Sequence, residues 1–275
     1  MLKKGLEGIL SQSELDELFS AFDQVGDIII LRIPDSLLTK KKIIGETLLE
    51  RVKSANSVFY QSSPVDGDFR TRDLELIAGT DRTETEYREF GCRFRVDVQK
   101  TFFSPRLSTE RKRIADLIRD RDVIINMFGG IGMFSIVAAK EKECIVYNID
   151  INPHAIRLCE QNIKLNKLLG KIKPIEGDAK KIIDEQLEGK GDRILMLLPE
   201  RSDDFLDSAI KAAKKNAVIH YYCHIHGDKK NDVPVLAKEH FLSVMSIKSD
   251  VLGSKIVRPV GPRYYQAVVD AKITK

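Results

Sequence analysis

The stretch that decides the fold is Asp122-Val-Ile-Ile-Asn126-Met-Phe-Gly-Gly-Ile-Gly132, which an alanine-rich segment and then Cys144-Ile-Val-Tyr-Asn-Ile-Asp150 follow. The apolar run 123–125 is typical of a strand that is buried on both faces. The glycines after it permit positive φ and let a ligand lie against the backbone. We therefore predict a strand, a glycine turn, a helix over 134–140 and a second strand over 145–149.

Asp150 stands where this kind of fold holds its ligands. It follows the second predicted strand and lies 20 residues after Gly130. In open α/β sheets, ligands bind beyond the carboxyl ends of the strands, and an acidic residue about 20 residues past the turn can accept hydrogen bonds from a ribose. The spacing Gly129-Gly130-Ile131-Gly132 is not the dinucleotide fingerprint, and the chain has no P-loop motif. The pattern favours an adenosine without pyrophosphate, such as S-adenosylmethionine, over a tight turn with nothing bound.

The composition indicates a globular protein with one large or two modest domains. The 275 residues are 43% hydrophobic and 31% charged. No apolar run approaches the roughly 18 residues of a membrane span, and the first residues lack the apolar core of a signal peptide. The four cysteines are scattered without a C-x-x-C pair, which is typical of reduced thiols. We expect a cytoplasmic protein with no membrane contact.

The net charge of +4 is mild, so any contact with nucleic acid requires a local basic patch. The segment 100–113 is the candidate, because Glu110 is its single acidic residue among five cations. These cations are Lys100, Arg106, Arg111, Lys112 and Arg113. The alternative is an ordinary solvated surface.

Residues 1–100 are predicted to form a small α+β domain. Helices are expected over 12–22, with Ser13 as N-cap, and over 40–52. Strands are expected over 25–33, 57–61, 73–78, 83–88 and 92–98, with a turn at 66–68. The last three strands alternate apolar and polar residues, so we expect a mixed or antiparallel sheet.

Residues 101–275 are predicted to form a doubly wound α/β domain. Ser108 is the expected N-cap of a helix over 109–119, which precedes the first buried strand. Further helices are expected over 155–166, 203–214 and 231–240, and further strands over 172–176, 193–198, 217–223, 241–251 and 264–273. Regular alternation of strand and helix indicates a parallel sheet, and the last two strands indicate an antiparallel edge.

The chain resembles the archaeal and eukaryotic tRNA (guanine-N1)-methyltransferases that act at tRNA position 37, and the related wybutosine-pathway enzymes. The matching stretches are Val65-Asp-Gly-Asp-Phe-Arg70-Thr-Arg72, Leu74-Glu-Leu-Ile-Ala-Gly79, Gly91-Cys-Arg-Phe94, Phe103-Ser-Pro-Arg-Leu-Ser-Thr-Glu-Arg111, Asn126-Met-Phe-Gly-Gly-Ile-Gly132 and Val218-Ile-His-Tyr-Tyr222. The resemblance covers about 20–273. It implies a Rossmann-like class I methyltransferase fold, S-adenosylmethionine as cofactor and the anticodon region of tRNA as partner. It also implies a monomer without a metal, and we expect the chain to lack the extra N-terminal domain that many members carry.

The resemblance assigns the chemistry to three residues. Guanine N1 carries a proton at neutral pH, so methylation there needs a base, and Glu110 would be that base. Arg70 would donate hydrogen bonds to the guanine or to a neighbouring phosphate, which stabilises charge on O6. Arg106 would lie near cofactor and target. The alternatives are that Glu110 is a helix carboxylate favoured by the helix dipole, and that Arg70 and Arg72 are surface charges.

The same resemblance and the predicted strand ends imply a cofactor-binding set. It comprises Phe102, Arg106, Asn126, Phe128, Gly129, Gly130, Gly132, Asp150, Ile151, Asp178, Ala179, Leu197 and Pro199. In such a site Asp178 would accept a hydrogen bond from the adenine amino group, and the alternative is an ordinary turn aspartate. Cys223-His224-Ile225-His226 does not predict zinc, because a strand points these side chains to alternate faces and no second cysteine pair accompanies them.

One position departs from the pattern of the guanine methyltransferases. Their strand ends in Asn-Leu-Pro and the Asn touches the target base, whereas here Leu197 takes that place in Met196-Leu197-Leu198-Pro199-Glu200. Backbone carbonyls, Glu200 or a different substrate would account for the change. The leading hypothesis is N1 methylation of guanosine 37. The alternatives are a wybutosine-pathway aminocarboxypropyl transferase, a methyltransferase acting on a modified guanosine, and a non-catalytic tRNA-binding module.

Overall fold

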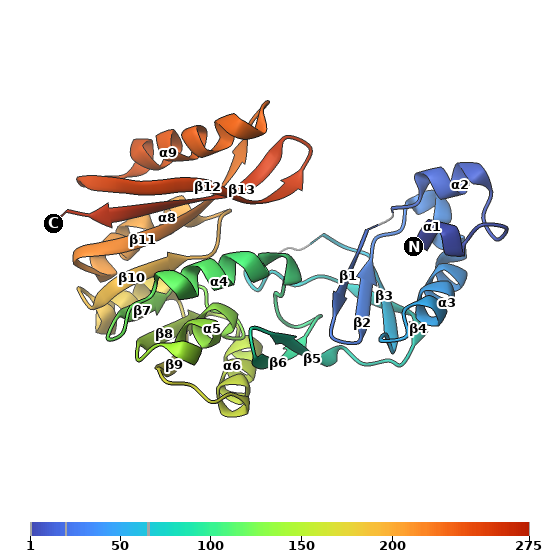
Figure 1. The fold of residues 1–275 in the computed structure, drawn as a ribbon, viewed down its shortest axis with the longest axis horizontal. Helices are drawn as coiled ribbons and strands as arrows, with labels where there is room; N and C mark the ends of the chain where they lie inside the picture. Colours follow the sequence, from blue (N-terminus) through green and yellow to red (C-terminus); the bar gives the residue numbers. More distant parts are fainter. Residues whose placement is uncertain (1, 20, 65–66, 275) are drawn as a thin grey trace. The chain divides into compact units, whose positions relative to one another are not determined.

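The computed structural model describes residues 2–19, 21–64 and 67–274, and its chain divides into two compact units, Met1–Pro105 and Arg106–Lys275 (Figure 1). The sequence placed the boundary between 100 and 101. Val65 and Asp66, which belong to the predicted turn, lie outside the described residues. Within the described ranges, the helices are too short or too polar to cross a membrane.

The first unit is built on a four-stranded mixed sheet in the order β1-β2-β3-β4. Its strands are β1 (Phe22–Val25), β2 (Ile28–Leu31), β3 (Ser57–Gln61) and β4 (Leu74–Gly79). β2 and β3 run parallel, and the other pairs run antiparallel. The helices are α1 (Leu2–Gly5), α2 (Gln12–Glu17) and α3 (Lys41–Arg51), with a 3-10 turn over Asp35–Lys40 before α3. Leucines of the helices and apolar residues of the strands share one core, to which α3 contributes Ile44 and Leu48.

Two element predictions in this unit are wrong. The strand expected over 25–33 is not continuous: Val25 ends β1 and β2 begins at Ile28, because Gly26 turns the chain at a φ of +56°. A side chain at Gly26 would lie 2.4 Å from the carbonyl oxygen of Glu86, so the position is also crowded. The helix expected to reach 22 ends at Glu17, and its N-cap is Ser11, whose capping box includes Glu14.

A separate hairpin completes the first unit. β5 (Glu84–Glu89) and β6 (Cys92–Asp97) pair antiparallel, and Phe90 and Gly91 join them with positive φ at both residues. Two central residues with positive φ are the hallmark of the tight turn that matches strand twist.

The second unit is built on a seven-stranded sheet in the order β12-β13-β11-β10-β7-β8-β9. Its strands are β7 (Val123–Asn126), β8 (Ile145–Asp150), β9 (Lys171–Glu176), β10 (Gly191–Met196), β11 (Ala213–His226), β12 (Ser249–Gly261) and β13 (Tyr264–Ile273). The five strands from β9 to β11 in the sheet order run parallel, while β13 is antiparallel to both neighbours. The predicted doubly wound sheet with an antiparallel edge is confirmed.

Helices cover both faces of this sheet (Figure 1). They are α4 (Ser108–Leu117), α5 (Met133–Glu141), α6 (Pro153–Leu165), α7 (Ala179–Ile182), α8 (Ser202–Ala212) and α9 (Val233–Val244). Neighbouring strand residues point to opposite faces: Ile124 packs in the cluster of α4 and α5, whereas Ile125 packs in that of α8 and α9. Burial on both faces explains why these strands read as unbroken apolar runs.

Three boundaries in the second unit differ from expectation. The strand expected over 241–251 is the end of α9 followed by β12, because a short apolar run fits a buried helix as well as a strand. The helix expected over 203–214 ends at Ala212, and β11 begins at Ala213. α4 begins at Ser108 after a 3-10 turn over Pro105–Leu107, so Ser108 is its first residue and Leu107 its cap.

Candidate active site

The glycine turn between β7 and α5 lies at the carboxyl end of the parallel strands. The N–H of Gly129 donates to the Ile149 carbonyl at 2.7 Å, and the N–H of Gly132 donates to the Gly129 carbonyl at 3.0 Å. Gly130 has a φ of +53°, and a side chain there would meet nothing within 4 Å. Gly132 has a φ of +87°, and its side chain would overlap Cys159 at 2.7 Å. The turn is therefore packed against α6 on one side and open on the other.

Asp150, the predicted ribose acceptor, is hydrogen-bonded to this turn. One carboxylate oxygen accepts from the N–H of Gly130 at 2.6 Å, and the other accepts from the N–H of Asn152 at 2.9 Å. Burial raises the pKa of Asp150 above its usual value, although both backbone donors act in the opposite direction. The next side chain, Ile151, is 44% exposed. An acceptor and an apolar surface thus stand side by side at the strand end.

Buried amides hold the turn from beneath. Asn126 Nδ2 donates to Ser135 Oγ at 3.2 Å, and Ser135 Oγ donates to Asn148 Oδ1 at 2.6 Å. Asn148 Nδ2 in turn donates to the Gly130 carbonyl at 3.3 Å. Asn126, predicted to touch the cofactor, is fully buried under the turn, and its Oδ1 is a buried oxygen without a hydrogen-bond partner.

Asp178 lies after β9 and starts α7. Its Oδ1 accepts from the N–H groups of Lys180 at 2.8 Å and Lys181 at 3.2 Å, so the residue is a helix N-cap. Ala179, the first residue of α7, is buried. Capping uses one carboxylate oxygen and fixes the direction in which the carboxylate points.

The end of β10 carries Leu197, the residue that departs from the guanine methyltransferases. Its side chain packs against the cluster formed by α4 and α5. The Leu198 carbonyl accepts from the Arg201 N–H and from Ser202 Oγ, both at 3.0 Å. That carbonyl is engaged in the turn before α8, so it is a poor substitute for the missing amide.

A cavity of about 290 Å³ lies beside this strand end. Its walls are Pro199, Glu200, Ser202, Asp203, Cys223, His224, His240 and Tyr264.

The predicted cofactor residue Phe128 packs edge-to-face on Phe205 of α8, with ring centroids 4.9 Å apart. No group of three His, Cys, Asp or Glu side chains suited to a metal ion occurs among the described residues.

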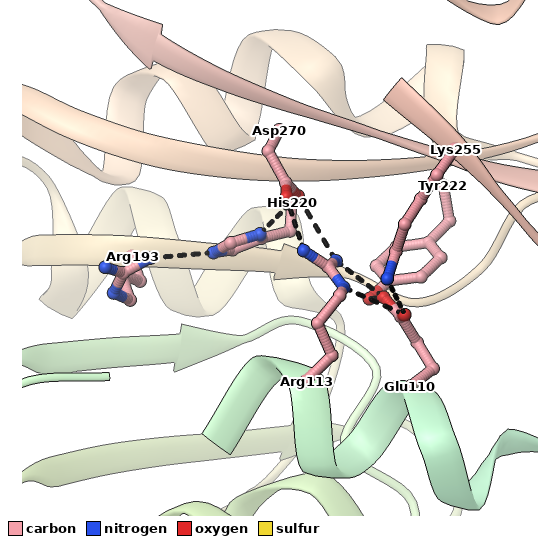
Figure 2. Close-up of polar contacts among 7 residues, drawn as sticks. All are labelled: Glu110, Arg113, Arg193, His220, Tyr222, Lys255 and Asp270. Atoms are coloured by element: carbon pink, nitrogen blue, oxygen red, sulfur yellow. Dashed lines mark hydrogen bonds and ion pairs between the residues drawn. The ribbon is translucent and has the colours of Figure 1, made fainter. Parts of the chain in front are cut away.

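Glu110 stands at the centre of a second polar cluster, on the first turn of α4 (Figure 2). Its Oε1 accepts from Arg113 Nη2 and from the hydroxyl of Tyr222, each at 2.6 Å. Its Oε2 accepts from Arg113 Nε at 2.9 Å and lies 3.4 Å from Lys255 Nζ. With a side-chain exposure of 4%, Glu110 is held by three elements and is not an ordinary solvated helix carboxylate.

The cluster continues along the strands. Arg113 forms an ion pair with Asp270 of β13, and its Nη2 also donates to Asp270 Oδ1 at 3.3 Å. Asp270 Oδ1 lies 2.7 Å from His220 Nδ1, and His220 Nε2 lies 3.2 Å from Arg193 Nη1 (Figure 2). Asp270 and His220 face each other in the β11–β13 ladder. We call Glu110, Arg113, Asp270, His220 and Arg193 the charge chain.

The protonation states of the charge chain follow from donors and acceptors. A guanidinium can only donate, so Nε2 of His220 accepts from Arg193 and Nδ1–H donates to Asp270. Burial lowers the pKa of His220, which agrees with this neutral form. Burial opposes ionisation of Asp270, but hydrogen bonds from His220 and Arg113 lower its pKa to about 2. Burial likewise disfavours charge on Arg113, yet hydrogen bonds to Glu110 and Asp270 raise its pKa.

Tyr222 is a donor throughout. Burial and the adjacent Glu110 carboxylate raise the pKa of its hydroxyl well above the usual value. The contacts described for Glu110, from Arg113, Tyr222 and Lys255, are therefore all made by donors.

Arg70 and Phe102 meet within the first unit. The guanidinium carbon of Arg70 lies 4.0 Å from the centroid of the Phe102 ring, which is a cation–π contact. Arg70 has a φ of +52° and precedes β4, so it is a turn residue. Arg72 donates to Gln61 Oε1 at 3.2 Å, and burial lowers its pKa.

The basic segment 100–113 does not present all its cations to solvent, so that part of the prediction is wrong. Arg111 is 2% exposed, with its guanidinium carbon 5.9 Å from the Phe134 ring centroid, and Arg113 belongs to the charge chain. Arg106 is exposed, and Lys112 forms an exposed pair with Asp116 at 2.6 Å. The two side chains leave α4 in different directions, Arg111 toward Phe134 of α5 and Arg113 toward Asp270 of β13.

Residues 85–241 match the TRM5/TYW2 methyltransferase domain, and residues 2–83 match the TYW2 N-terminal domain. The chain belongs to the TRM5/TYW2 methyltransferase family. The predicted family is thereby confirmed.

Two relatives within the TRM5/TYW2 family show how activities are spread among similar chains. The tRNA (guanine(37)-N(1))-methyltransferase Trm5b of Pyrococcus abyssi is 38% identical, over 93% of this chain and 75% of the relative. The tRNA 4-demethylwyosine(37)-methyltransferase Taw21 of Saccharolobus solfataricus is 34% identical, over 93% of this chain and 95% of the relative.

Solved structures of the family share the fold. The complex of aTrm5 and tRNALeu matches with a TM-score of 0.86 at 37% identity, covering 99% of this chain and 78% of that one. Methanocaldococcus jannaschii TYW2 in complex with AdoMet matches with a TM-score of 0.66 at 27% identity, covering 93% of this chain and 100% of that one. The class I methyltransferase fold predicted from the sequence is confirmed.

Proposed function

We propose that the protein transfers the methyl group of S-adenosylmethionine to N1 of guanosine 37 in tRNA, with Glu110 as general base. The observation that carries the proposal is the buried Glu110 carboxylate, which only donors surround, in the same compact unit as the glycine turn and Asp150. Relatives named for this activity match nearly the whole chain.

The turn and its neighbours fit an adenosyl group. The space beside Gly130 is open, and the Asp150 carboxylate and the exposed Ile151 border it in sequence and structure. Asp150 would hold the ribose hydroxyls, Ile151 would pack on the adenine, and Asp178 would accept from the adenine amino group. When bound, the cofactor supplies an electrophilic methyl group on a positively charged sulfur.

The chemistry at guanine N1 needs proton removal and orientation. Glu110 accepts the N1 proton, and the electron pair left on N1 forms the bond to the methyl carbon as the carbon–sulfur bond breaks. The proton remains on Glu110 until solvent takes it. Arg70 would donate to O6 or to a neighbouring phosphate, and its contact with Phe102 restricts its guanidinium. Arg106 would assist near the cofactor.

The test is incubation of the protein with unmodified tRNA and S-adenosylmethionine, followed by mass spectrometry of the nucleosides. We expect a guanosine that gains one methyl group at position 37. A gain of the aminocarboxypropyl group would show the other transfer chemistry, and no gain on any tRNA would overturn the proposed activity.

Replacing the base tests the assignment of Glu110. Glu110→Gln keeps the size of the side chain but cannot take a proton, so single-turnover methyl transfer should fall by about 10²–10⁴-fold. Binding of tRNA and cofactor should change little. Asp184→Asn, which removes a carboxylate from an exposed pair with Lys211, is the matched control. A Glu110→Gln variant with the wild-type rate would move the assignment to Glu200 at the cavity.

A second candidate function is methylation of a modified guanosine, 4-demethylwyosine, at the same position. Two observations favour it: the match to Taw21 spans 95% of that protein, and Leu197 cannot hydrogen-bond guanine. Glu200 at the cavity wall would then meet a substrate of different shape. A tRNA that carries 4-demethylwyosine, offered beside unmodified tRNA, separates the two activities by their relative kcat/KM.

The first unit is proposed to contact the tRNA, together with Arg106 and Lys112, whose side chains reach solvent.

We also propose that the protein is a cytoplasmic monomer. All four cysteines are buried free thiols, which suits a reducing compartment.

A further inference from the structure

Arg113 lies between two carboxylates, and this arrangement has a consequence for any reaction that protonates Glu110. On one side Arg113 makes two hydrogen bonds to Glu110, at 2.6 and 2.9 Å. On the other side it pairs with Asp270. The side chains of Arg113 and Asp270 are 18% and 17% exposed, so solvent contributes little to their stability.

We propose that Asp270 is a positioning residue for the base Glu110, acting through Arg113. The inference rests on the proposed function. When Glu110 accepts a proton it loses its charge, and an Arg113 paired with Glu110 alone would become a buried cation without a counter-ion, which is costly. Asp270 keeps Arg113 paired in both states of Glu110. It thereby reduces the cost of protonation and makes Glu110 a stronger base.

His220 and Arg193 fix Asp270 in this role. His220 donates Nδ1–H to Asp270 at 2.7 Å while its Nε2 accepts from Arg193 at 3.2 Å. Arg193 is anchored in turn by Asp122, whose carboxylate accepts from Arg193 Nε at 3.0 Å. The neutral imidazole orients the carboxylate without adding a charge, so Asp270 remains a full counter-ion for Arg113.

The other groups that face Glu110 oppose its protonation. Tyr222 of β11 donates to Oε1, and Lys255 of β12 lies 3.4 Å from Oε2, while Arg113 approaches from α4 itself. Lys255 is 45% exposed, so its replacement leaves the core undisturbed. Asp270 therefore favours protonation of Glu110, whereas Lys255 opposes it. Variants of the two residues can be compared with each other, because they should change the reaction in opposite directions.

The experiment is the pH dependence of single-turnover methyl transfer by the full chain with saturating tRNA and S-adenosylmethionine. In Asp270→Asn we expect the acid limb to move to lower pH by about one unit, since a nearby charge changes an acid equilibrium by that order. The plateau rate should fall by about tenfold, because a weaker base transfers the proton less readily. Lys255→Met should move the acid limb in the opposite direction.

The controls separate positioning from folding. Asp270→Glu should restore the acid limb, and Asp184→Asn should match wild type. Calorimetric affinity for S-adenosylmethionine within about twofold of wild type shows that a variant is folded; if Asp270→Asn fails this criterion, Asp270→Ser serves in its place, with the same expected shift. A lower plateau with an unmoved acid limb would reduce Asp270 to a structural role and overturn the inference, as would a wild-type profile.

Glu110→Gln distinguishes this failure from a failure of the proposed function. If Glu110→Gln is slow but the uncharged Asp270 variant keeps the wild-type acid limb, only the inference is wrong. If Glu110→Gln keeps the wild-type rate, Glu110 is not the base. The proposed role of Glu110 and the inference about Asp270 are then both wrong.

Discussion

At Asp150, two backbone N–H groups orient a carboxylate whose burial already disfavours its charge. Asp150→Ala should therefore weaken S-adenosylmethionine binding, because each hydrogen bond to a charged group contributes about 1.5–3 kcal/mol. That loss corresponds to more than tenfold in affinity for a single bond. Isothermal titration calorimetry measures it, with Asp184→Asn as control. An unchanged affinity would remove Asp150 from the cofactor site.

The residues that could be predicted from the sequence are those that lie in continuous motifs. Glu110, Asp150 and the glycines can be named as candidates in this way, because short spacings reveal them. The charge chain itself could not be predicted, since Arg113 and Asp270 are 157 residues apart and His220 and Asp270 are 50 apart. Asp270 did carry a signal: it is the acid within the apolar run of β13, where an ionised group requires a partner.

At the scale of elements, the pairing of β11 with β13 places Asp270 opposite His220 and predicts how stability depends on pH. The pKa of Asp270 is lowered to about 2 in the folded chain, against about 3.9 when unfolded. The unfolded state therefore binds the proton more readily. Asp270 contributes about 2 kcal/mol to the free energy of unfolding. This contribution is complete above pH ~5 and disappears as pH falls toward 2.

Urea unfolding from pH 7 to pH 2 measures this dependence. Asp270→Asn should flatten the free energy of unfolding below pH ~5. His220 adds a separate term of the same sign, because burial lowers its pKa: the unfolded imidazole gains a proton below pH ~6.5 while the buried one resists it. A variant that retains the wild-type slope below pH ~5 would show that Asp270 is not held as an ion.

Elements were predicted well where their periodicity was long and poorly where a turn interrupts an apolar run. Gly26 and Asp27 form the turn between β1, which ends at Val25, and β2, which begins at Ile28, and the sequence alone does not show this hairpin. The end of α9 was assigned to a strand because Phe241 and its neighbours are apolar in either structure. In both cases, packing against the rest of the unit determines which secondary structure the segment adopts.

At the scale of the whole molecule, binding of tRNA should depend on salt through few cations. Because Arg111 is buried and Arg113 is paired with Glu110 and Asp270, Lys112 is one of the cations of segment 100–113 left to meet phosphates. Lys112→Ala should lower the slope of log affinity against log salt concentration by about 0.7–0.9. Lys211→Ala, an exposed lysine paired with Asp184 in the same way, should leave the slope unchanged. Filter binding at several salt concentrations provides the data, and equal slopes for both variants would exclude Lys112 from the interface.

The order of the two units could be predicted because their patterns differ: short alternating strands come first, and strand–helix alternation follows. The boundary predicted between 100 and 101 lies five residues before the end of the first compact unit at Pro105. The family assignment needed no such precision, because the motif Phe103 to Arg111 is identified by its residues although it crosses the boundary.

The contact between Gly132 and Cys159 makes one thiol a natural reporter of breathing at the cofactor turn. Cys159 is completely buried, and this burial, with the nearby carboxylates of Asp150 and Glu160, raises its pKa to about 12. An alkylating reagent reacts with the thiolate and must reach the sulfur. While the turn is closed, the thiol stays protonated and out of the reagent's reach. The rate at which Cys159 is alkylated therefore measures how often α6 separates from the turn by local opening. A ligand that binds the turn and stabilises it should lower that rate.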